Sequence, residues 1–243
     1  MTPNNRGCVN ALALFMFVAL AAIVAISFAR ASETDTASQD DRSAEVLEVN
    51  DKPYRWVFNY GEDMQLPELP TGCEATAAAT LARMNGFYVT KTQVADAMSK
   101  SDSDFVNAFL GDPYSKHGWA TSAPCVTDTL NGFFEIEEKL AAINLTGTDL
   151  FDLPVPCAVW ATIDMTAPDD PVRASDGYGL YRNTHCVVLT RVGEVAVDII
   201  DPLRGDCQQP TDQFIEIYDA MGKQAVYVAD LTTILRMQRG EEL

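Results

Sequence analysis

The sequence predicts a two-part α+β domain, in which helices from about Thr71 to Leu145 pack on an antiparallel sheet built from about Cys157 to Val228. Two patterns support this fold class. Residues 70–86 are a run of good helix formers bounded by stop signals, and residues 185–201 read as two apolar, β-branched strands joined by a turn. Of the 243 residues 47% are hydrophobic and 21% charged, which is typical of a globular protein.

The N-terminal segment, residues 1–31, is predicted to be a signal peptide or a membrane anchor. From Ala11 to Phe28 the only polar residue is Ser27, so the run is long enough for a signal-peptide core or a short membrane span. Residues 29–31 then give the small-x-small pattern that signal peptidase recognises. Cleavage after residue 31 and retention as an anchor both stay open. Either outcome places the rest of the chain at the extracellular face of the cell membrane or in secreted form.

A second change in composition marks the start of the globular part. Residues 32–51 are rich in Ser, Thr, Asp, Glu and Gln and have almost no large apolar side chain, so they cannot bury enough surface to offset the entropy cost of ordering. We expect this segment to be an acidic flexible tether. An aromatic cluster at 54–60 follows, and we assign residues 52–243 to the globular domain.

The charge balance limits the partners of the chain. Asp and Glu number 35 against 17 Lys and Arg, which gives a formal net charge of -18, so nucleic acid is not expected as a ligand. Only two histidines occur, far apart in the sequence, and there is no close Cys-x-x-Cys pair. The sequence therefore implies no metal and no cofactor, and it does not specify an oligomeric state.

Five of the six cysteines lie beyond the apolar segment: Cys73, Cys125, Cys157, Cys186 and Cys207. An odd number leaves at least one thiol unpaired within the domain, as a catalytic cysteine would be. The other four have two interpretations. They form up to two disulfides in an oxidising compartment, or they are small buried apolar residues.

Cys73 lies at the start of the clearest helix in the chain. Thr71 is expected as the N-cap with Glu74 as its capping-box partner, and Asn85 with Gly86 suits a left-handed exit. Cys73 then falls in the first turn. There, free backbone N–H groups and the helix dipole favour a thiolate over a thiol, so Cys73 is a candidate nucleophile.

Gln65 is a candidate oxyanion donor. It lies eight residues before Cys73, in a stretch whose two prolines prevent regular structure and hold the chain in an extended path. A side-chain amide beside the nucleophile can complete an oxyanion hole with the backbone N–H of Cys73. The alternative is an ordinary surface glutamine.

His185 and Asp201 are predicted to be neighbours across a β-hairpin. Residues 185–190 and 195–201 are apolar and β-branched, and a Gly-Glu pair between them supplies the turn. If the loop comprises residues 192–194, His185 pairs directly with Asp201. Directly paired residues have Cβ atoms about 4.5–5.5 Å apart on one face of the sheet. The carboxylate can therefore accept a hydrogen bond from the imidazole and fix its tautomer.

These two assignments have alternatives. Asp201 precedes a proline and also suits a turn at the end of a strand, and Asp198 is a weaker candidate because it belongs to the other face. The other histidine, His117, lies in a loop-like stretch where contact with substrate or simple exposure is expected.

Taken together, these motifs resemble the bacterial peptidase-like proteins related to the bacteriocin-processing double-glycine cysteine peptidases of the papain-like superfamily. The resemblance covers about 65–228 and rests on residues 70–74, 111–114, 156–162, 184–190, 201–205 and 218–226. It implies a papain-like fold whose N-terminal helical part carries the cysteine and whose sheet carries the histidine and aspartate. It also implies Cys73 as nucleophile, His185 as base, Asp201 as orienting group and Gln65 as oxyanion donor.

The resemblance implies a peptide or protein substrate, but fold does not fix substrate. The processing peptidases are usually fused to transporter domains that are not found here, so cleavage after a double-glycine leader does not carry over. Two other functions stay open on the same residues. One is acyl transfer to an amine, and the other is an exported binding module without catalysis.

Overall fold

The computed structural model describes residues 58–135 and 139–239. The predicted signal or anchor (1–31) and the predicted tether (32–51) lie outside these ranges. Within the described ranges, no helix combines the length and the apolar character needed to cross a lipid bilayer.

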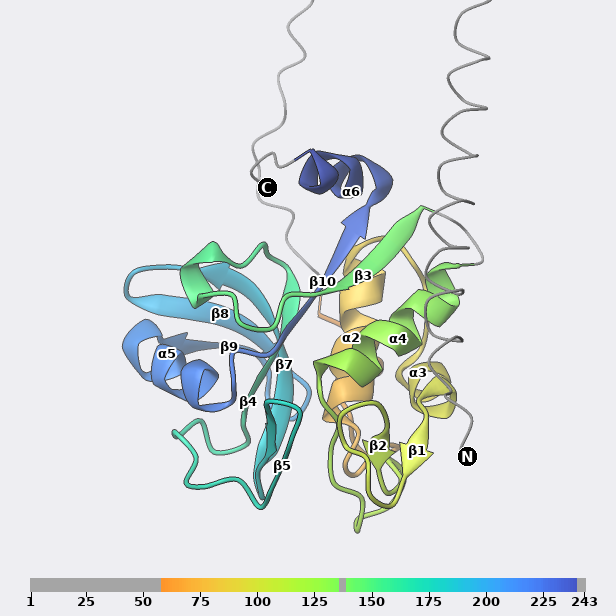
Figure 1. Cartoon of the computed structure of the whole chain (residues 1–243), viewed down its shortest axis with the longest axis vertical. Coiled ribbons are helices and arrows are strands. Elements are labelled where there is room, and N and C mark those ends of the chain that lie inside the picture. The colour runs from red at the N-terminus through yellow and green to blue at the C-terminus, as the bar shows by residue number, and fades with distance from the viewer. Residues whose placement is uncertain (1–57, 136–138, 240–243) are drawn as a thin grey trace, which may run out of the picture. The chain divides into compact units, whose positions relative to one another are not determined.

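The domain is built around a six-stranded antiparallel sheet with the strand order β3-β10-β4-β7-β8-β9 (Figure 1). Two short two-stranded sheets lie beside it. The strands are β1 (Lys100–Ser101), β2 (Phe109–Leu110), β3 (Leu140–Asn144), β4 (Cys157–Thr162), β5 (Arg173–Ser175), β6 (Tyr178–Leu180), β7 (Thr184–Val192), β8 (Ala196–Asp201), β9 (Gly205–Pro210) and β10 (Ala225–Asp230).

Helices cover the central strands. They are α2 (Cys73–Met84), α3 (Lys91–Ala97), α4 (Ala123–Phe134), α5 (Thr211–Ala220) and α6 (Leu231–Gln238), with a 3-10 turn, η1, at Leu150–Asp152. Helix α2 packs against β7 and β4, whereas α5 packs against β4, β8 and β9. All of β4 is buried, as are the first six residues of β7, so the middle of the sheet is covered on both faces.

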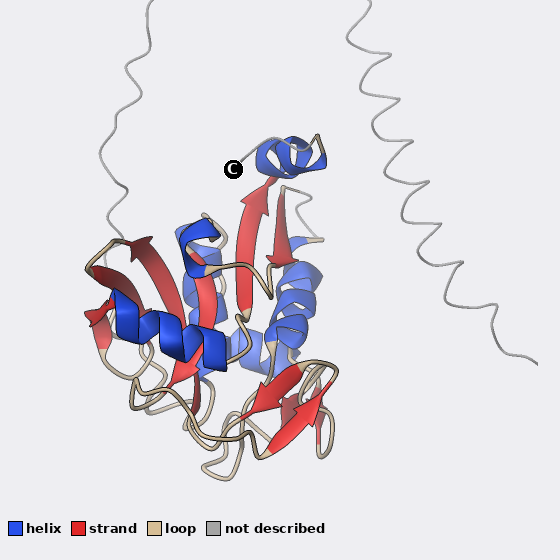
Figure 2. Cartoon of the chain, turned by 60° about the vertical axis from the view of Figure 1, so that its left-hand side comes forward, coloured by secondary structure: helices blue, strands red, loops and turns tan. Residues whose placement is uncertain are grey.

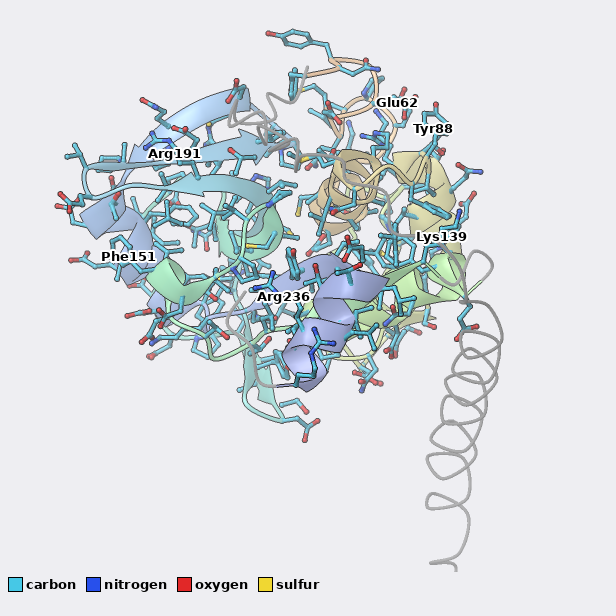
Figure 3. All side chains as sticks on the ribbon, turned by 90° about the horizontal axis from the view of Figure 1, so that it is seen from above. Glu62, Tyr88, Lys139, Phe151, Arg191 and Arg236 are labelled. Atoms are coloured by element: carbon cyan, nitrogen blue, oxygen red, sulfur yellow. The ribbon has the colours of Figure 1, made fainter. Side chains whose placement is uncertain are left out.

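The predicted two-part α+β architecture is confirmed, with one boundary corrected. Figure 2 separates the helices from the strands by colour, and Figure 3 shows the domain from above, with Tyr88 on the helical side and Arg191 on the sheet side. The sheet begins at β3, inside the region expected to be helical. This edge strand pairs with β10, some 80 residues later in the chain, so its conformation depends on a distant partner rather than on local sequence.

Helix α2 is held by burial rather than by the expected cap. Every residue from Cys73 to Ala82 is buried, and the many alanines let the helix approach its neighbours closely. The N-cap is Gly72, without a side-chain cap hydrogen bond, so the predicted capping box is wrong. The predicted exit is present, because Gly86 has φ of 82°, which glycine adopts without strain.

Two buried cations fix the segment before α2. Arg83 Nη2 lies 2.5 Å from Asp63 Oδ1, and both side chains are almost fully buried. Lys91 Nζ donates to the carbonyls of Gly61 and Met64 at 2.9 and 2.6 Å. These bonds hold residues 61–64 against the helices, and this placement determines where the following residue, Gln65, lies.

Candidate active site

His185 and Asp201 meet as expected, but in a different register. His185 Nε2 lies 2.7 Å from Asp201 Oδ1, and both residues are fully buried. Strand β7 pairs Val188 with Ile200, two residues away from the predicted register, because the turn closes later and a β-bulge follows Leu189. A shift of two residues keeps every side chain on its face of the sheet, so the two side chains still meet.

Asp201 is held as a carboxylate. Burial alone would raise its pKa, but hydrogen bonds from His185, from the Leu203 backbone N–H (2.7 Å) and from Arg204 (2.6 Å) outweigh burial and lower the pKa to about 2. Arg204 also donates to the Ile163 carbonyl. No sequence pattern predicts this role for Arg204, although the residue follows Asp201 by three positions in a turn.

The hydrogen bond to Asp201 determines which nitrogen of His185 is available. An ionised carboxylate only accepts, so Nε2 must carry the proton in this bond. His185 Nδ1 is buried and has no hydrogen-bond partner among the described residues. In the neutral ring Nδ1 is the acceptor, and it is therefore the nitrogen that can take a proton.

Cys73 is the first residue of α2 and is 5% exposed. Its Sγ donates to Glu74 Oε2 at 3.2 Å, and no hydrogen bond joins it to His185 in the described part of the chain. Burial raises the pKa of the Cys73 thiol and the Glu74 carboxylate raises it further, while the backbone N–H of Cys186 opposes them. In this arrangement burial outweighs the expected effect of the helix start, and the thiol is neutral.

Glu74 is a buried acid beside the candidate nucleophile rather than half of a capping box. It is fully buried, and Oε1 accepts the backbone N–H of Thr121 at 3.1 Å. Burial raises the pKa of Glu74 to about 7, against the lowering effect of hydrogen bonds from its own backbone, Cys73 and Thr121. The sequence pattern of a capping box concealed this role, because the same spacing suits both.

Gln65 is buried, with 3% of its surface exposed. Its Nε2 donates to the Pro70 carbonyl at 3.2 Å, and its backbone N–H donates to the Pro202 carbonyl at 2.9 Å. Its Oε1 has no partner within the described ranges. Gln65 is therefore no ordinary surface residue, since its amide is fixed between the segment before α2 and the turn after β8.

Three of the four predicted site residues line one cleft of about 610 Å³, and Asp201 lies behind His185. The lining residues are Gln65, Leu66, Pro70, Thr71, Cys73, Lys116, His117, Gly118, Trp119, Ile163, Tyr181, Arg182, Thr184, His185 and Leu203. His117 is thus at the cleft, in keeping with the expected substrate contact or exposure. Asp198 lies elsewhere and pairs with Arg191.

The other cysteines lie outside this cleft. Cys125, Cys157 and Cys186 are buried and Cys207 is half-buried, and all of them, like Cys73, are free thiols in the structure. Among the described residues, no three His, Cys, Asp or Glu side chains are grouped as a metal site requires.

A helical part that carries a cysteine, packed on an antiparallel sheet that carries a hydrogen-bonded histidine and aspartate, is the papain-like α+β arrangement. Residues 58–226 match the model of the Peptidase_C39 like family, and the chain belongs to this family.

Three solved structures are similar to this chain to different degrees, and the first of them supports the fold. A protein of Bacillus anthracis classed as a C39-like peptidase is 25% identical, with a TM-score of 0.59 over 70% of this chain and 94% of that one. A double-glycine-motif protease from an AMS/PCAT transporter, solved with its leader peptide, is 18% identical (TM-score 0.43, 68% and 87% covered). The peptidase domain of Streptococcus ComA is 13% identical (TM-score 0.41, 65% and 90% covered). Among curated proteins, no sequence matches the chain.

The raised pKa of Glu74 predicts a stability that falls as the pH rises. Below pH 4.5, the ordinary pKa of a glutamate, the Glu74 carboxyl group is protonated in both the folded and the unfolded state. Between pH 4.5 and about 7 the unfolded chain ionises at Glu74 while the folded chain keeps its proton, so the folded state loses stability. Above pH 7 this loss of stability is complete. Glu74→Gln should therefore match the wild type at pH 4 and be more stable at pH 8, by up to about 3 kcal/mol. Urea unfolding at both pH values measures this.

Glu216→Gln is the matched control, because Glu216 is exposed on α5. It should give no gain at pH 8. A Glu74→Gln variant whose stability relative to the wild type is the same at both pH values would show that Glu74 ionises at its ordinary pKa and that burial does not keep it protonated.

Proposed function

We propose that the chain is a cysteine peptidase that hydrolyses amide bonds of peptide substrates, with Cys73 as nucleophile, His185 as base and Asp201 as the group that orients the histidine. The observation that carries this proposal is that Cys73 and His185 line one cleft, while the buried Asp201 binds His185 from behind. Membership of the C39-like peptidase family supports the same reaction. Exposed apolar side chains in the cleft, Leu66, Trp119 and Ile163, offer contact surface to a peptide.

In this mechanism Cys73 exchanges one partner for another. Rotation about its Cα–Cβ bond takes Sγ from Glu74 toward Nδ1 of His185, which accepts the thiol proton. The imidazolium that forms is stabilised by Asp201. The attraction between thiolate and imidazolium then offsets the free-energy cost of a buried thiolate, which keeps the thiol neutral in the resting arrangement. The thiolate then attacks the substrate carbonyl, and His185 returns the proton to the leaving amine.

Two donors are available for the oxyanion. Cys73 is the first residue of α2, so its backbone N–H has no intrahelical partner. Gln65 Nε2 has two hydrogens, and only one is used by the Pro70 carbonyl. We propose that the second hydrogen and the Cys73 N–H stabilise the charge that develops on the substrate oxygen. Water then releases the acyl group from Cys73.

Cys73→Ala and His185→Ala should each lower peptide turnover by more than about a thousandfold, because each removes a group that acts in the chemical step. A thiol-directed electrophile followed by peptide mapping should label Cys73 first. Cys207→Ala, at a half-buried free cysteine outside the cleft, is the control and should keep its activity. Near wild-type turnover by the Cys73→Ala protein would refute the assignment.

Asp201→Asn should lower kcat by about ten- to a thousandfold, since it keeps the shape of the side chain but loses the charge that stabilises the imidazolium. The matched control is Asp198→Asn on the same strand, whose carboxylate pairs with Arg191 at the surface. The pH dependence of kcat/KM should change only in the Asp201 variant. Equal rates for the wild type and Asp201→Asn would mean that another group holds the histidine.

We further propose that the peptidase domain acts outside the cell membrane. The support is the apolar run Ala11–Phe28 and the small residues after it. N-terminal sequencing of the protein isolated from its host is expected to give either a chain that starts at Ser32 or one that keeps the run and sediments with membranes. Recovery of the intact chain from the cytosol would contradict export.

A further inference from the structure

The cleft is positively charged in a chain that is otherwise strongly acidic. Asp and Glu outnumber Lys and Arg by 35 to 17 in the sequence, but among the described residues no Asp or Glu lines the cleft. Its charged or titratable lining residues are Lys116, Arg182, two histidines, Tyr181 and the candidate nucleophile. Most charged residues of this chain are carboxylates, so a lining that has two cations and no carboxylate requires an explanation.

The two cations come from different halves of the domain. Lys116 lies on the loop 112–118 that follows β2, on the side of Cys73, and Arg182 lies between β6 and β7, three residues before His185. The region after β2 and the β5–β6 hairpin lie at the same end of the domain (Figure 1). Both side chains are exposed, and in the described part of the chain neither makes an ion pair or a side-chain hydrogen bond. Their charge is therefore available to a ligand.

The loop that carries Lys116 is fixed to the nucleophile segment. The backbone N–H of Thr71 donates to the Pro113 carbonyl at 3.3 Å, and its hydroxyl lies 3.0 Å from the Ser115 carbonyl. Gly118 passes so close to Thr71 that a Cβ there would lie 2.4 Å from the hydroxyl oxygen. Lys116 is thus presented by a backbone whose position relative to Cys73 is set.

Arg182 is presented in the same way from the sheet side. Thr184 Oγ1 donates to the Tyr181 carbonyl and accepts the Tyr181 N–H, both at 3.0 Å, which closes the turn around Arg182. The Tyr181 hydroxyl donates to the Ala220 carbonyl at 2.8 Å, which ties this turn to the end of α5. Both cations therefore stand on backbones that are fixed near the reacting groups.

We propose that Lys116 and Arg182 select peptides that carry Asp or Glu side chains close to the scissile bond. The proposal rests on the proposed peptidase function and adds its substrate class. The acidic remainder of the surface repels such a peptide, and the cleft attracts it, so the field directs the substrate to the site. The preference for acidic side chains is confined to substrate residues that lie near Cys73, because the adjoining hollow beyond His117 is lined by Asp102 and Asp112, which repel a carboxylate.

Binding to the Cys73→Ala protein tests this without requiring turnover. Fluorescent peptides that carry Glu on both sides of a candidate bond are compared with the same peptides carrying Gln. We expect the Glu peptides to bind about three- to tenfold more tightly at low salt, the range that two exposed ion pairs can supply, and the difference to shrink in 0.5 M salt. Lys116→Gln and Arg182→Gln, each made in this background, should reduce the preference, and the double variant should remove it.

Lys139→Gln is the matched control. Lys139 is exposed just before β3, the opposite edge strand of the sheet from β9, and lines neither hollow (Figure 3). It should keep the full preference.

Equal binding of Glu and Gln peptides, binding of neither, or a preference that survives the double variant would each overturn the proposal. These results are separate from the test of catalysis. If the wild-type enzyme cleaves Glu and Gln peptides equally well, the proposed peptidase function holds and the proposed selectivity is refuted. If Glu peptides bind more tightly but no peptide is cleaved, the selectivity holds and the peptidase function is refuted.

Discussion

Helix α2 lies directly against strand β7, and its alanine-rich surface lets the two backbones approach closely. The helix begins at Cys73 and the strand reaches His185 at its second residue, so this single packing contact brings the two groups to one cleft. Larger side chains along α2 would separate the elements and widen the distance between sulfur and imidazole. The small residues that looked merely helix-favouring in the sequence therefore have a second role, since they set the geometry of the site.

Two buried carboxyl groups in this site have opposite environments. Asp201 receives three hydrogen bonds, two of them from cationic or potentially cationic groups, and stays ionised. Glu74 receives only a backbone N–H and a thiol, and keeps its proton to about neutral pH. Divergent pKa values of neighbouring acids are typical of functional sites, because one acid can then hold a charge while the other can change it. Here Asp201, which stays ionised, lies behind the histidine, and Glu74, whose charge changes near neutral pH, lies beside the thiol.

Much of this arrangement follows from local sequence. The helix from Cys73, its exit at Gly86 and the contact of His185 with Asp201 each depend on periodicity, turn residues or strand parity, which a single sequence displays. The hairpin register did not follow, because the turn closes later than the Gly-Glu pair indicates, and a bulge after Leu189, which no local pattern marks, then changes the shift from three residues to two. A face-preserving shift left the key contact intact. A shift by one residue would have lost it.

The residues whose roles the sequence did not predict have one thing in common, because their surroundings are determined by contacts between distant parts of the chain. Arg204, Lys116 and Arg182 act through the positions of turns that are fixed by residues far away in the chain, such as Thr71 for the loop 112–118. Glu74 was misjudged because its burial is a tertiary property, while its spacing from Thr71 is a local one. Sequence alone identifies residues by type and order, but charge in a cleft is the sum over segments whose proximity is decided only by the fold.

The attachment of the loop 112–118 to Thr71 divides the site into parts that can vary independently. The anchoring bonds use backbone carbonyls on the loop side, so they place few demands on its side chains, apart from the close approach at Gly118. Tyr114 and Ser115 also make side-chain hydrogen bonds, to Thr92, Asp96 and the His117 N–H, whereas the side chains of Lys116 and His117 make none among the described residues, so these two positions can be exchanged while the loop keeps its path. Proteins of this architecture can acquire new preferences through exchange of a few loop side chains, with the reacting groups and their supports left unaltered.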